Sequence, residues 1–488
     1  MSEKRVKTTS KLMMFEEEKV DRISKLHDEI LIHILSFLPT EDLLPTSLIS
    51  KRWRFLWCSV PSLNFLQTKK IGHLDGQEMF YNFVDNFLEN RKRGMDNDDH
   101  HDSVITSFKL YIDQYDWDNA HASHFIDRWL GLVVENKVKE IHLVLWEEKY
   151  DRENGIMYYT SLPKPLLNAK YLTILNLVRV DLDCSYTFSF PYLKSLKLCV
   201  VRFAEKDVLD NLLLGSPSLE RLELSNLCSD YKLHIHSDSL ALKFLEVVVS
   251  DNIVVESIEV VNLESMRLVG VPFEKINLMV CKRIRTLWLG CDFNMNELSS
   301  LEYLISNLPL LEDLTLSNDQ CLGLKRIKIS SESLKSFSVE NSGDNTEMNV
   351  VVESAPKLES FRYKGKHKFS ITMESSNSLN GTFIILAWPW EKFDGDWFIN
   401  LLNLLLNLNC CWNKVTLHVD TLKALIFPKN LRRACRSSLL NWKHLTVFAT
   451  RVEKESELRD ALLWMSPSLK TLSILKRSSL ACYCYPRL

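Results

Sequence analysis

The sequence predicts a mixed α/β protein in which a small helical domain precedes a solenoid of stacked strand-and-helix repeats. Three observations lead to this prediction. A six-residue pattern, L-x-x-L-x-L with other apolar residues allowed, recurs along most of the chain. Stretches with the apolar spacing of a helix, such as 207–216 and 297–308, precede several of its copies. Near the N-terminus, apolar residues between Leu26 and Leu38 lie one helical turn apart on one broad face.

The repeats begin mostly about 21 to 27 residues apart, the spacing expected for stacked units of one strand each. In each copy the last two apolar positions alternate with a polar one, as one face of a strand requires. One unit cannot bury that face alone, so stacked units share a core, with parallel strands on the concave side and helices on the convex side. The copies begin at residues 172, 193, 219, 242, 263, 284, 311, 324, 334 and 358, with fainter ones at 138, 412, 442 and 469. The close spacing of 311, 324 and 334 predicts irregular repeats there.

The segment 21–57 is the most informative part of the chain. Asp28 and Glu29 put negative charge at the expected start of a helix, and Pro39 is expected to stop it. A second short helix follows; with Asp42 as its N-cap, Pro45 takes the third helical position, where its missing N–H costs nothing. So short a segment cannot bury all its apolar groups itself, and it must pack on the rest of the chain or on a partner.

This segment resembles the F-box motif of plant F-box/leucine-rich-repeat proteins. The matching positions are Asp21, Ile23, Ser24, Leu26, Asp28, Ile30, Leu31, Ile34 to Pro39, Thr46, Ser47, Ser50 to Arg54, Leu56 and Trp57. Two departures stand out: His27 occupies a position where the family usually has proline, and Pro45 lies within the second helix. The alternative reading of the same periodicity is a helical hairpin that packs on the repeats.

The C-terminal part resembles the FBD region that closes many of these plant proteins. The resemblance rests on LLNWKHLTVF at 439–448 and LRDALLWMSPSLKTLSI at 458–474. It predicts a cap over the open end of the solenoid. The expected organisation is a disordered segment 1–20, an F-box at 21–65, a linking region with the first irregular repeats at 66–137, leucine-rich repeats at 138–365 and an FBD-like cap at 366–488.

The resemblance implies the substrate-recognition subunit of an SCF-type cullin–RING ubiquitin ligase. Its F-box would bind a Skp-type adaptor, and through it the cullin and RING subunits, while the repeats hold an unknown target protein. The expected adaptor-binding residues are Leu26, Ile30, Leu31, Ile34, Leu35, Leu38, Pro39, Leu43, Trp53 and Leu56. Exposed strand residues that could meet the target are Lys194, Lys197, Arg221, Glu223, Arg285, Trp288, Arg326 and Lys328. The alternative function is a repeat scaffold with a degenerate F-box, which binds a partner without causing its degradation.

Catalytic, cofactor and metal sites are not expected. The chain contains no GxxxxGK[ST], GxGxxG, GxSxG or HExxH motif. His234 and His236 are expected on one face of a strand, which supplies only two metal ligands. An enzyme of unrecognised class is the third and weakest hypothesis.

Composition points to an ordinary core-forming protein. The chain is 46% hydrophobic and 25% charged, and its formal net charge of −3 gives no reason to expect nucleic acid or an anionic membrane as partner. The 12 cysteines form no CxxC pair, so we expect reduced thiols and a location in the cytoplasm, the nucleus or both. The apolar run 398–408 is interrupted by three asparagines at helical spacing, which predicts an amphipathic helix rather than a membrane span.

Overall fold

The computed structural model divides the chain into two compact units, Met1–Leu110 and Tyr111–Leu488. It describes residue 23 and the ranges 25–67, 74–96, 104–113, 120–146, 159–205, 207–227, 232–237, 241–249, 254–271, 280–290, 302, 305–317, 326–341, 348–366, 369–373, 379–386, 392–407, 412–434, 440–451 and 455–476. The segment 1–20 and most of the helix predicted at 297–308 lie outside these residues. In the described part, no helix is both long enough and apolar enough to cross a membrane.

The first unit is a small helical assembly followed by strands. Its elements are α1 (Asp28–Leu35), α2 (Thr40–Thr46), the 3₁₀ turn η1 (Leu56–Ser59), β1 (Ser62–Gln67), the long helix α3 (Leu74–Asp96) and β2 (Ser107–Ile112), which runs into the second unit. Leu31 and Leu35 of α1 are fully buried. Phe65 of β1 lies at the centre of an aromatic cluster, with ring centroids 5.5 Å from Phe87 and 5.8 Å from Phe108.

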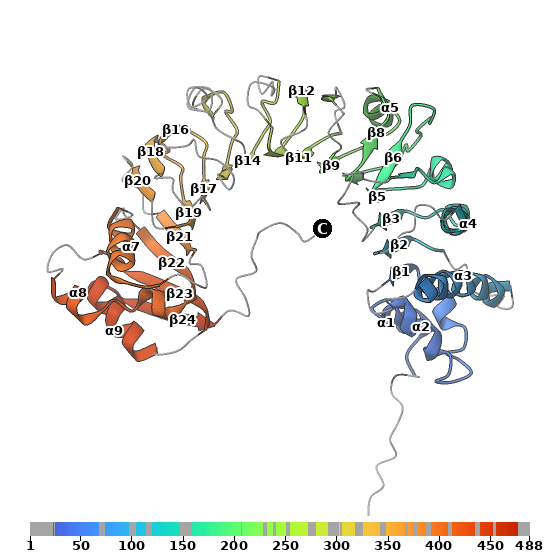
Figure 1. Ribbon diagram of the computed structural model, residues 1–488, viewed down its shortest axis with the longest axis horizontal. Helices are drawn as coiled ribbons and strands as arrows, with labels where there is room; N and C mark the ends of the chain where they lie inside the picture. The colour runs from blue at the N-terminus through green and yellow to red at the C-terminus, as the bar shows by residue number, and fades with distance from the viewer. Residues whose placement is uncertain are drawn as a thin grey trace, which may run out of the picture. The chain divides into compact units, whose positions relative to one another are not determined.

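The second unit is built on one long parallel sheet (Figure 1). Its strands follow one another in chain order: β3 (Glu140–Leu145), β5 (Ile174–Val178), β7 (Ser195–Cys199), β9 (Arg221–Ser225), β11 (Phe244–Val248), β13 (Ser265–Val269), β14 (Thr286–Gly290), β15 (Asp313–Ser317), β17 (Ser336–Asn341), β19 (Ser360–Gly365), β21 (Leu379–Ile385), β22 (Trp412–Thr421), β23 (His444–Arg451) and β24 (Thr471–Lys476). Each strand stacks on the previous one, as predicted for a solenoid.

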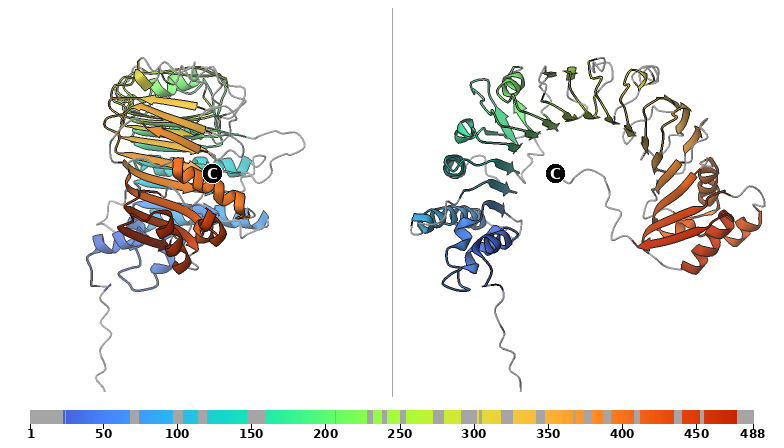
Figure 2. Two further views of the ribbon diagram at one scale, coloured as in Figure 1. Left: turned by 90° about the vertical axis from the view of Figure 1, so that its left-hand side faces the viewer. Right: turned by 180° about the vertical axis from the view of Figure 1, so that it is seen from behind.

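Helices and short second strands occupy the outer side of this unit (Figures 1 and 2). The helices are α4 (Ala120–Glu135), α5 (Val208–Leu214), α7 (Gly395–Asn407), α8 (Lys429–Ala434) and α9 (Glu455–Met465), with the 3₁₀ turns η2 (Lys164–Asn168) and η5 (Leu422–Leu425). Three small parallel sheets join them: β4 (Thr160–Ser161) with β6 (Val180–Leu182) and β8 (Arg202–Phe203); β10 (Lys232–Ser237) with β12 (Val254–Val260); and β16 (Arg326–Ser330) with β18 (Met348–Ser354) and β20 (Phe369–Met373). The mixed α/β prediction is confirmed, and the outer strands are an addition to it.

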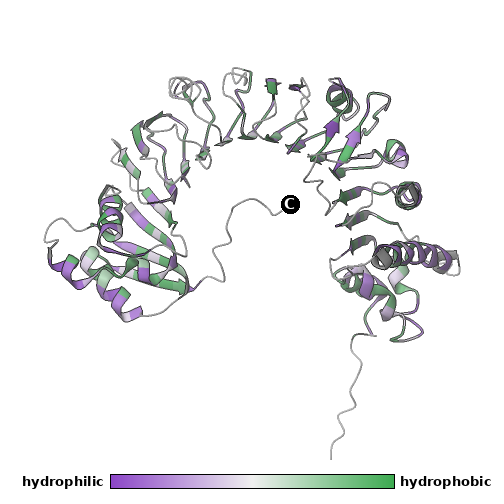
Figure 3. Ribbon diagram, viewed as in Figure 1, coloured by the Kyte–Doolittle hydropathy of each residue, from purple (hydrophilic) through white to green (hydrophobic). Residues whose placement is uncertain are grey.

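The core lies between the long sheet and these outer elements, where apolar side chains alternate with polar ones along each strand (Figure 3). Leu196, Leu222 and Leu245 occupy the same register position in successive strands and are fully buried. Burying one such side chain contributes about 1.5–3 kcal/mol, so the repeated leucines explain why the units stack.

The copy of the pattern at 324–329 is not a repeat of the long sheet. Its residues from Arg326 on belong to β16, which pairs with β18 in an outer sheet. Strands β15 and β17 pair directly, so the copies at 311 and 334 are consecutive repeats, 23 residues apart by subtraction. Ile327 and Ile329 of β16 are buried. Because one face of this outer strand is buried, its residues alternate between apolar and polar as those of the long sheet do. Arg326 and Lys328, expected among the exposed strand residues that could meet the target, therefore belong to an outer sheet and not to the long one.

The C-terminal part continues the sheet as strand β23, helix α9 and strand β24. Leu458, Leu462 and Met465 of α9 are fully buried. The last strand, β24, is half-buried or exposed at every position. The expected capping of the sheet end by this region stays a prediction.

Candidate functional site

Two surfaces present unusual side chains to solvent: the helical part of the first unit and the open face of the long sheet in the second. They differ in chemistry.

Helix α1 has two apolar sides, only one of which is buried. Leu31 and Leu35 form the buried side, while Ile30 is 46% and Ile34 40% exposed. His27 is the N-cap residue and makes no capping hydrogen bond through its side chain. The apolar arc of this helix is therefore broader than the chain can cover.

The ten residues predicted to bind an adaptor divide in the same way. Leu31, Leu35, Leu43, Trp53 and Leu56 are buried within the first unit, so the structure gives them a core role. Ile30, Ile34, Leu38 and Pro39 are exposed and Leu26 is half-buried. For these five, contact with an adaptor stays a prediction.

Other exposed apolar residues here were not among those predicted. Between Ile23 and Phe55 the most exposed are Leu48 at 87%, Phe37 at 75% and Ile49 at 58%, followed by Ile23, Phe55 and Leu44. A concentration of large exposed apolar side chains in one small unit indicates an interaction site. The available signal was the width of the apolar arc. Six of the eight residues from 30 to 37 are apolar, and His33 is a seventh with an aromatic ring, which is more than one buried stripe needs.

Hydrogen bonds connect the basic segment after α2 to the start of α1. The Arg52 guanidinium donates to the Asp28 carboxylate, with Nε 2.8 Å from Oδ1, and also to the Leu26 carbonyl. Trp53 is buried, as expected, and the Trp57 indole N–H donates to the Arg54 carbonyl at 3.0 Å. These bonds hold the start of α1 against the segment that follows α2.

Pro45 lies deeper in α2 than predicted. The helix begins at Thr40 with Pro39 as its N-cap, so Pro45 is its sixth residue rather than its third. The missing N–H leaves the carbonyl of Glu41 without its usual helical partner. The chain then continues with i→i−3 bonds, from Ser47 N–H to Leu44 and from Leu48 N–H to Pro45, and the helix ends at Thr46.

Beneath these helices a buried arginine binds the end of η1. Arg91 of α3 is 1% exposed, and its guanidinium lies 3.5 Å from the Trp57 carbonyl oxygen. Burial lowers the pKa of Arg91 to about 10. This group is structural, because it faces the interior.

In strands β5 to β19 of the second unit, the first, third and fifth residues face away from the core. The third positions form one row across paired strands, which Thr382, the fourth residue of β21, continues: Asn176, Lys197, Glu223, Glu246, Arg267, Trp288, Thr315, Ser338, Arg362 and Thr382. Lys197 pairs with Glu223 at 3.3 Å, and Glu246 with Arg267 at 3.7 Å. The row is charged from β7 to β13 and mostly hydroxyl-bearing from β15 on.

A tryptophan marks the change between these halves. The Arg267 guanidinium lies 4.2 Å from the centroid of the Trp288 ring. The ring edge reaches over Gly290, where an added Cβ would be 2.6 Å from it. Because Gly290, the fifth residue of β14, has no side chain, the Trp288 indole can lie along its own strand.

A second row, immediately before the strands, alternates in charge. Its successive members are Lys194, Glu220, Lys243, Glu264, Arg285, Glu312, Lys335 and Glu359, each donating its backbone N–H to the carbonyl of the member before it. Glu312 pairs with Arg285 at 2.8 Å and with Lys335 at 3.0 Å. We call these eight residues the alternating row. Lys194, Lys197, Arg221, Glu223, Arg285 and Trp288, all expected on this face, lie in or beside these rows.

Two glutamates, one in each row, have opposite pKa shifts. Burial raises the pKa of Glu246, against the opposing effect of Arg267. The hydrogen bond from Lys335 lowers the pKa of Glu312, and Arg285 adds to it. Charge on this face is therefore largely compensated within the chain.

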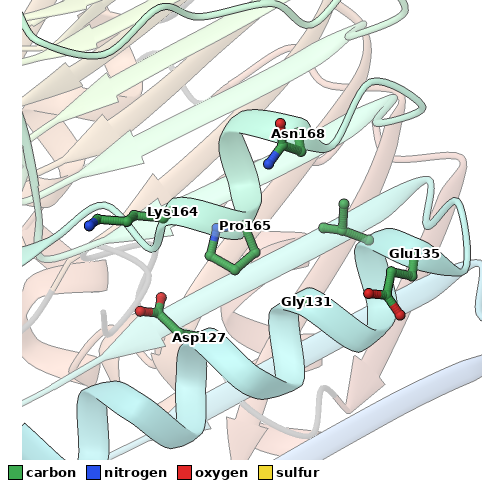
Figure 4. Close-up of a pocket in the computed structure, with 7 residues that line it drawn as sticks. Asp127, Gly131, Glu135, Lys164, Pro165 and Asn168 are labelled. Carbon is green, nitrogen blue, oxygen red and sulfur yellow. The ribbon is translucent and has the colours of Figure 1, made fainter.

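A shallow pocket of about 400 Å³ lies between α4 and η2 (Figure 4). It is lined by Asp127, Gly131, Val134, Glu135, Lys164, Pro165 and Asn168. Burial raises the pKa of Asp127, although its carboxylate accepts the backbone N–H of Lys164. That bond satisfies the start of η2, so we assign Asp127 a structural role. Among the residues that the structure describes, no three His, Cys, Asp or Glu side chains gather as metal ligands would.

Comparison with known proteins identifies both units. The F-box domain family matches residues 23–65. The family described as "FBD-associated F-box protein At5g56370, LRR repeats" matches 126–287 and 281–380, which together span 255 of the 488 residues.

Curated relatives agree with these families. F-box/LRR-repeat protein 13 of Arabidopsis thaliana is 33% identical over 51% of this chain and 52% of its own length. F-box/FBD/LRR-repeat protein At1g78750 of the same plant is 29% identical over 50% of each chain. The chain thus spans about half the length of the curated relatives it matches.

A solved structure, the crystal structure of a TLR13–ssRNA13 complex, aligns with 78% of this chain at 12% identity and a TM-score of 0.32, too low to support an inference. The helical unit, the stacked repeats and the two family matches together show that the chain belongs to the plant FBD-associated F-box/leucine-rich-repeat family.

Proposed function

We propose that this chain is a substrate-recognition subunit of an SCF-type cullin–RING ubiquitin ligase. The exposed apolar side chains of the first unit bind a Skp-type adaptor, and the open sheet face of the second unit holds a target protein. The chain catalyses nothing itself and acts by proximity, since it holds the target near the ligase. We place this function in the cytoplasm, the nucleus or both.

The observation that carries the proposal is the exposure of Phe37, Leu48 and Ile49 in a unit that matches an F-box. Apolar side chains this exposed lower solubility unless a partner covers them. Helical interfaces of this kind bind by placing an apolar face in a complementary groove. The alternating row, by contrast, is compensated and does not require a permanent partner.

The test is co-expression of the full chain with an Arabidopsis Skp-type adaptor, followed by measurement of complex formation. The informative variant is Phe37→Asp/Leu48→Asp, because both side chains are exposed and their replacement leaves the core intact. Leu214→Asp is the matched control, since Leu214 of α5 is 80% exposed in the second unit. We expect a complex with wild type and the control, and loss of binding by at least about 100-fold with the double variant. Folded wild type that does not bind would overturn the proposal.

The second candidate is a non-degradative scaffold whose F-box no longer binds an adaptor. His27, which makes no side-chain cap, and Pro45, which removes a hydrogen bond within α2, favour it. The same co-expression decides between the candidates. If wild type fails and His27→Pro or Pro45→Ala restores binding, the F-box is degenerate and the scaffold function stands.

A further inference from the structure

At the ends of several strands of the long sheet, the backbone adopts a left-handed conformation. Arg179 alone separates β5 from β6, and it adopts a left-handed backbone with φ of 63°. Val200 and Asn226 follow the next two strands with φ of 54° and 50°, and Gly270 follows β13 with φ of 72°. Glycine and asparagine accept this conformation readily, whereas arginine and valine do so under strain. Strain of this kind, when observed, is a reason to look for function.

The Arg179 side chain is buried without a charged partner. The residue is 8% exposed, and its Nε has no hydrogen-bond partner. Among the described residues no carboxylate pairs with it, and its contact is the Trp146 ring, whose centroid lies 5.2 Å from the guanidinium carbon. A buried cation without an anion is unfavourable. Among the residues that the structure describes, the site therefore has no negative group.

The neighbouring arginine shows what a satisfied pair looks like. Arg202, at the start of β8, lies over the Tyr159 ring at 5.3 Å and donates from Nε to the Asp181 carboxylate at 3.1 Å. Both arginines thus use an aromatic ring, but Arg202 also has an acid. Arg179 therefore differs from Arg202 in having no acidic partner among the described residues.

Apolar groups surround this corner on the open face. Val144, Val178 and Cys199 are fifth-position residues of β3, β5 and β7, and with Val200 they form a buried cluster outside the main core. Tyr111, Trp146 and Tyr159 pack against that cluster. The fifth positions share a face with the charged third positions, so Arg179 lies at the edge of the proposed target-binding surface.

We propose that Arg179 binds an oxyanion carried by an acidic or phosphorylated side chain of a bound target peptide, next to an apolar residue of that peptide. This inference rests on the proposed function. With one guanidinium face on the indole, the N–H edge remains to donate two parallel bonds to a carboxylate or phosphate. The aromatic cluster supplies the apolar contact. The pocket at α4 and η2 does not include Arg179.

A peptide fits this site better than a nucleic acid. Binding a phosphodiester backbone takes several cations that are free to release counterions. On this face Lys197, Arg221, Arg267 and Arg285 are all paired with glutamates. A single buried guanidinium beside these paired cations suits the recognition of one anionic side chain.

The experiment is a selection from a random peptide library, with and without phosphoserine, on the full chain bound to its adaptor. Four forms are compared: wild type, Arg179→Gln, Arg179→Lys and Arg202→Gln. Arg202 is the matched control, because it also stacks on a ring, Tyr159 at 5.3 Å, but pairs with Asp181 and lies in an outer sheet. Selected peptides are then measured by fluorescence anisotropy, each against its Gln or Ser counterpart. Circular dichroism checks that the variants fold.

We expect wild type to enrich one acidic or phosphorylated position beside an apolar residue. Arg179→Gln should lower affinity for these peptides about tenfold or more, Arg179→Lys should be intermediate, and Arg202→Gln should stay within about twofold. Enrichment only with phosphoserine would identify the oxyanion as phosphate. No acidic enrichment, or equal enrichment with folded Arg179→Gln, would overturn the inference. Adaptor binding is measured on the same samples, so its loss would count against the proposed function and not against this site.

Discussion

The first unit exposes apolar side chains, whereas the second exposes charges of which many are already paired. Leu48 is 87% exposed in the first, while in the second Glu312 lies within 3.0 Å of two cations. An apolar surface is costly in water and favours a constant partner. A compensated polar face costs little when free and discriminates between partners by geometry and charge. The contrast suits a chain that keeps one partner and exchanges another.

The sharpest way to test this contrast is to compare buried and exposed leucines of the first unit. Leu35→Ala should destabilise it by about 2–5 kcal/mol, because the change leaves a cavity in a fully buried site. Leu48→Ala should change stability by less than about 0.5 kcal/mol but weaken adaptor binding. Hydrogen exchange of the segment 28–46 measures the first effect, and adaptor titration the second. Equal effects of the two changes on stability would contradict the division of α1 and its neighbours into core and interface.

The next largest effect is expected at two glycines of the sheet. Gly270 has a φ of 72°, and an added Cβ would lie 2.4 Å from the Val249 carbonyl oxygen. Gly270→Ala should therefore cost at least about 1–2 kcal/mol. At Gly290 the obstacle is only the end of the Trp288 ring, so Gly290→Ala should cost less and move the indole outward. Thermal unfolding measures the loss of stability in each variant, and acrylamide quenching measures the exposure of Trp288. A larger loss of stability in Gly290→Ala than in Gly270→Ala would contradict the role given to the left-handed backbone at residue 270.

A smaller effect should follow from disturbing the alternating row. Glu220→Lys places a third cation between Lys194 and Lys243, whose backbones bond to residue 220 on either side. Because Glu220 and Lys194 are about half exposed, the cost should be under about 1 kcal/mol and should vanish in 1 M salt. Glu220→Gln serves as control for loss of charge without reversal. A cost that persists in high salt would mean that packing, not charge order, matters here.

The smallest effect concerns pH and should have opposite signs at two glutamates. The pKa of Glu312 is lowered by Lys335, so its carboxylate stabilises the fold above the ordinary value of 4.5 and this contribution is lost as pH falls. The pKa of Glu246 is raised by burial, so deprotonation costs stability as pH rises from 4.5 through the raised value. Hence Glu312→Gln should be most destabilising at neutral pH, and Glu246→Gln least. Urea unfolding between pH 4 and 7 measures both; parallel curves would show that the local environments do not control these carboxyls.

The limits of sequence reasoning are clearest at strand β21, which the repeat pattern missed. In LNGTFII the core position is Gly381, where an added Cβ would lie 2.8 Å from the Phe383 ring and 2.9 Å from Trp412. Two aromatic rings fill the space that a leucine takes elsewhere. A rule that looks for an apolar side chain at each core position cannot find a strand whose core volume comes from its neighbours.

The sequence by itself determined the repeats, their parallel stacking and the helical unit before them. It could do so because alternation of apolar and polar residues sets which side of a strand is buried, and helical spacing does the same for α1. Only the tertiary structure decided that β16 belongs to an outer sheet, that Leu31 and Leu35 face inward while Phe37 and Leu48 do not, and that Arg179 is buried without an acid. Those outcomes depend on which distant residues cover a side chain, and local periodicity carries no information about that.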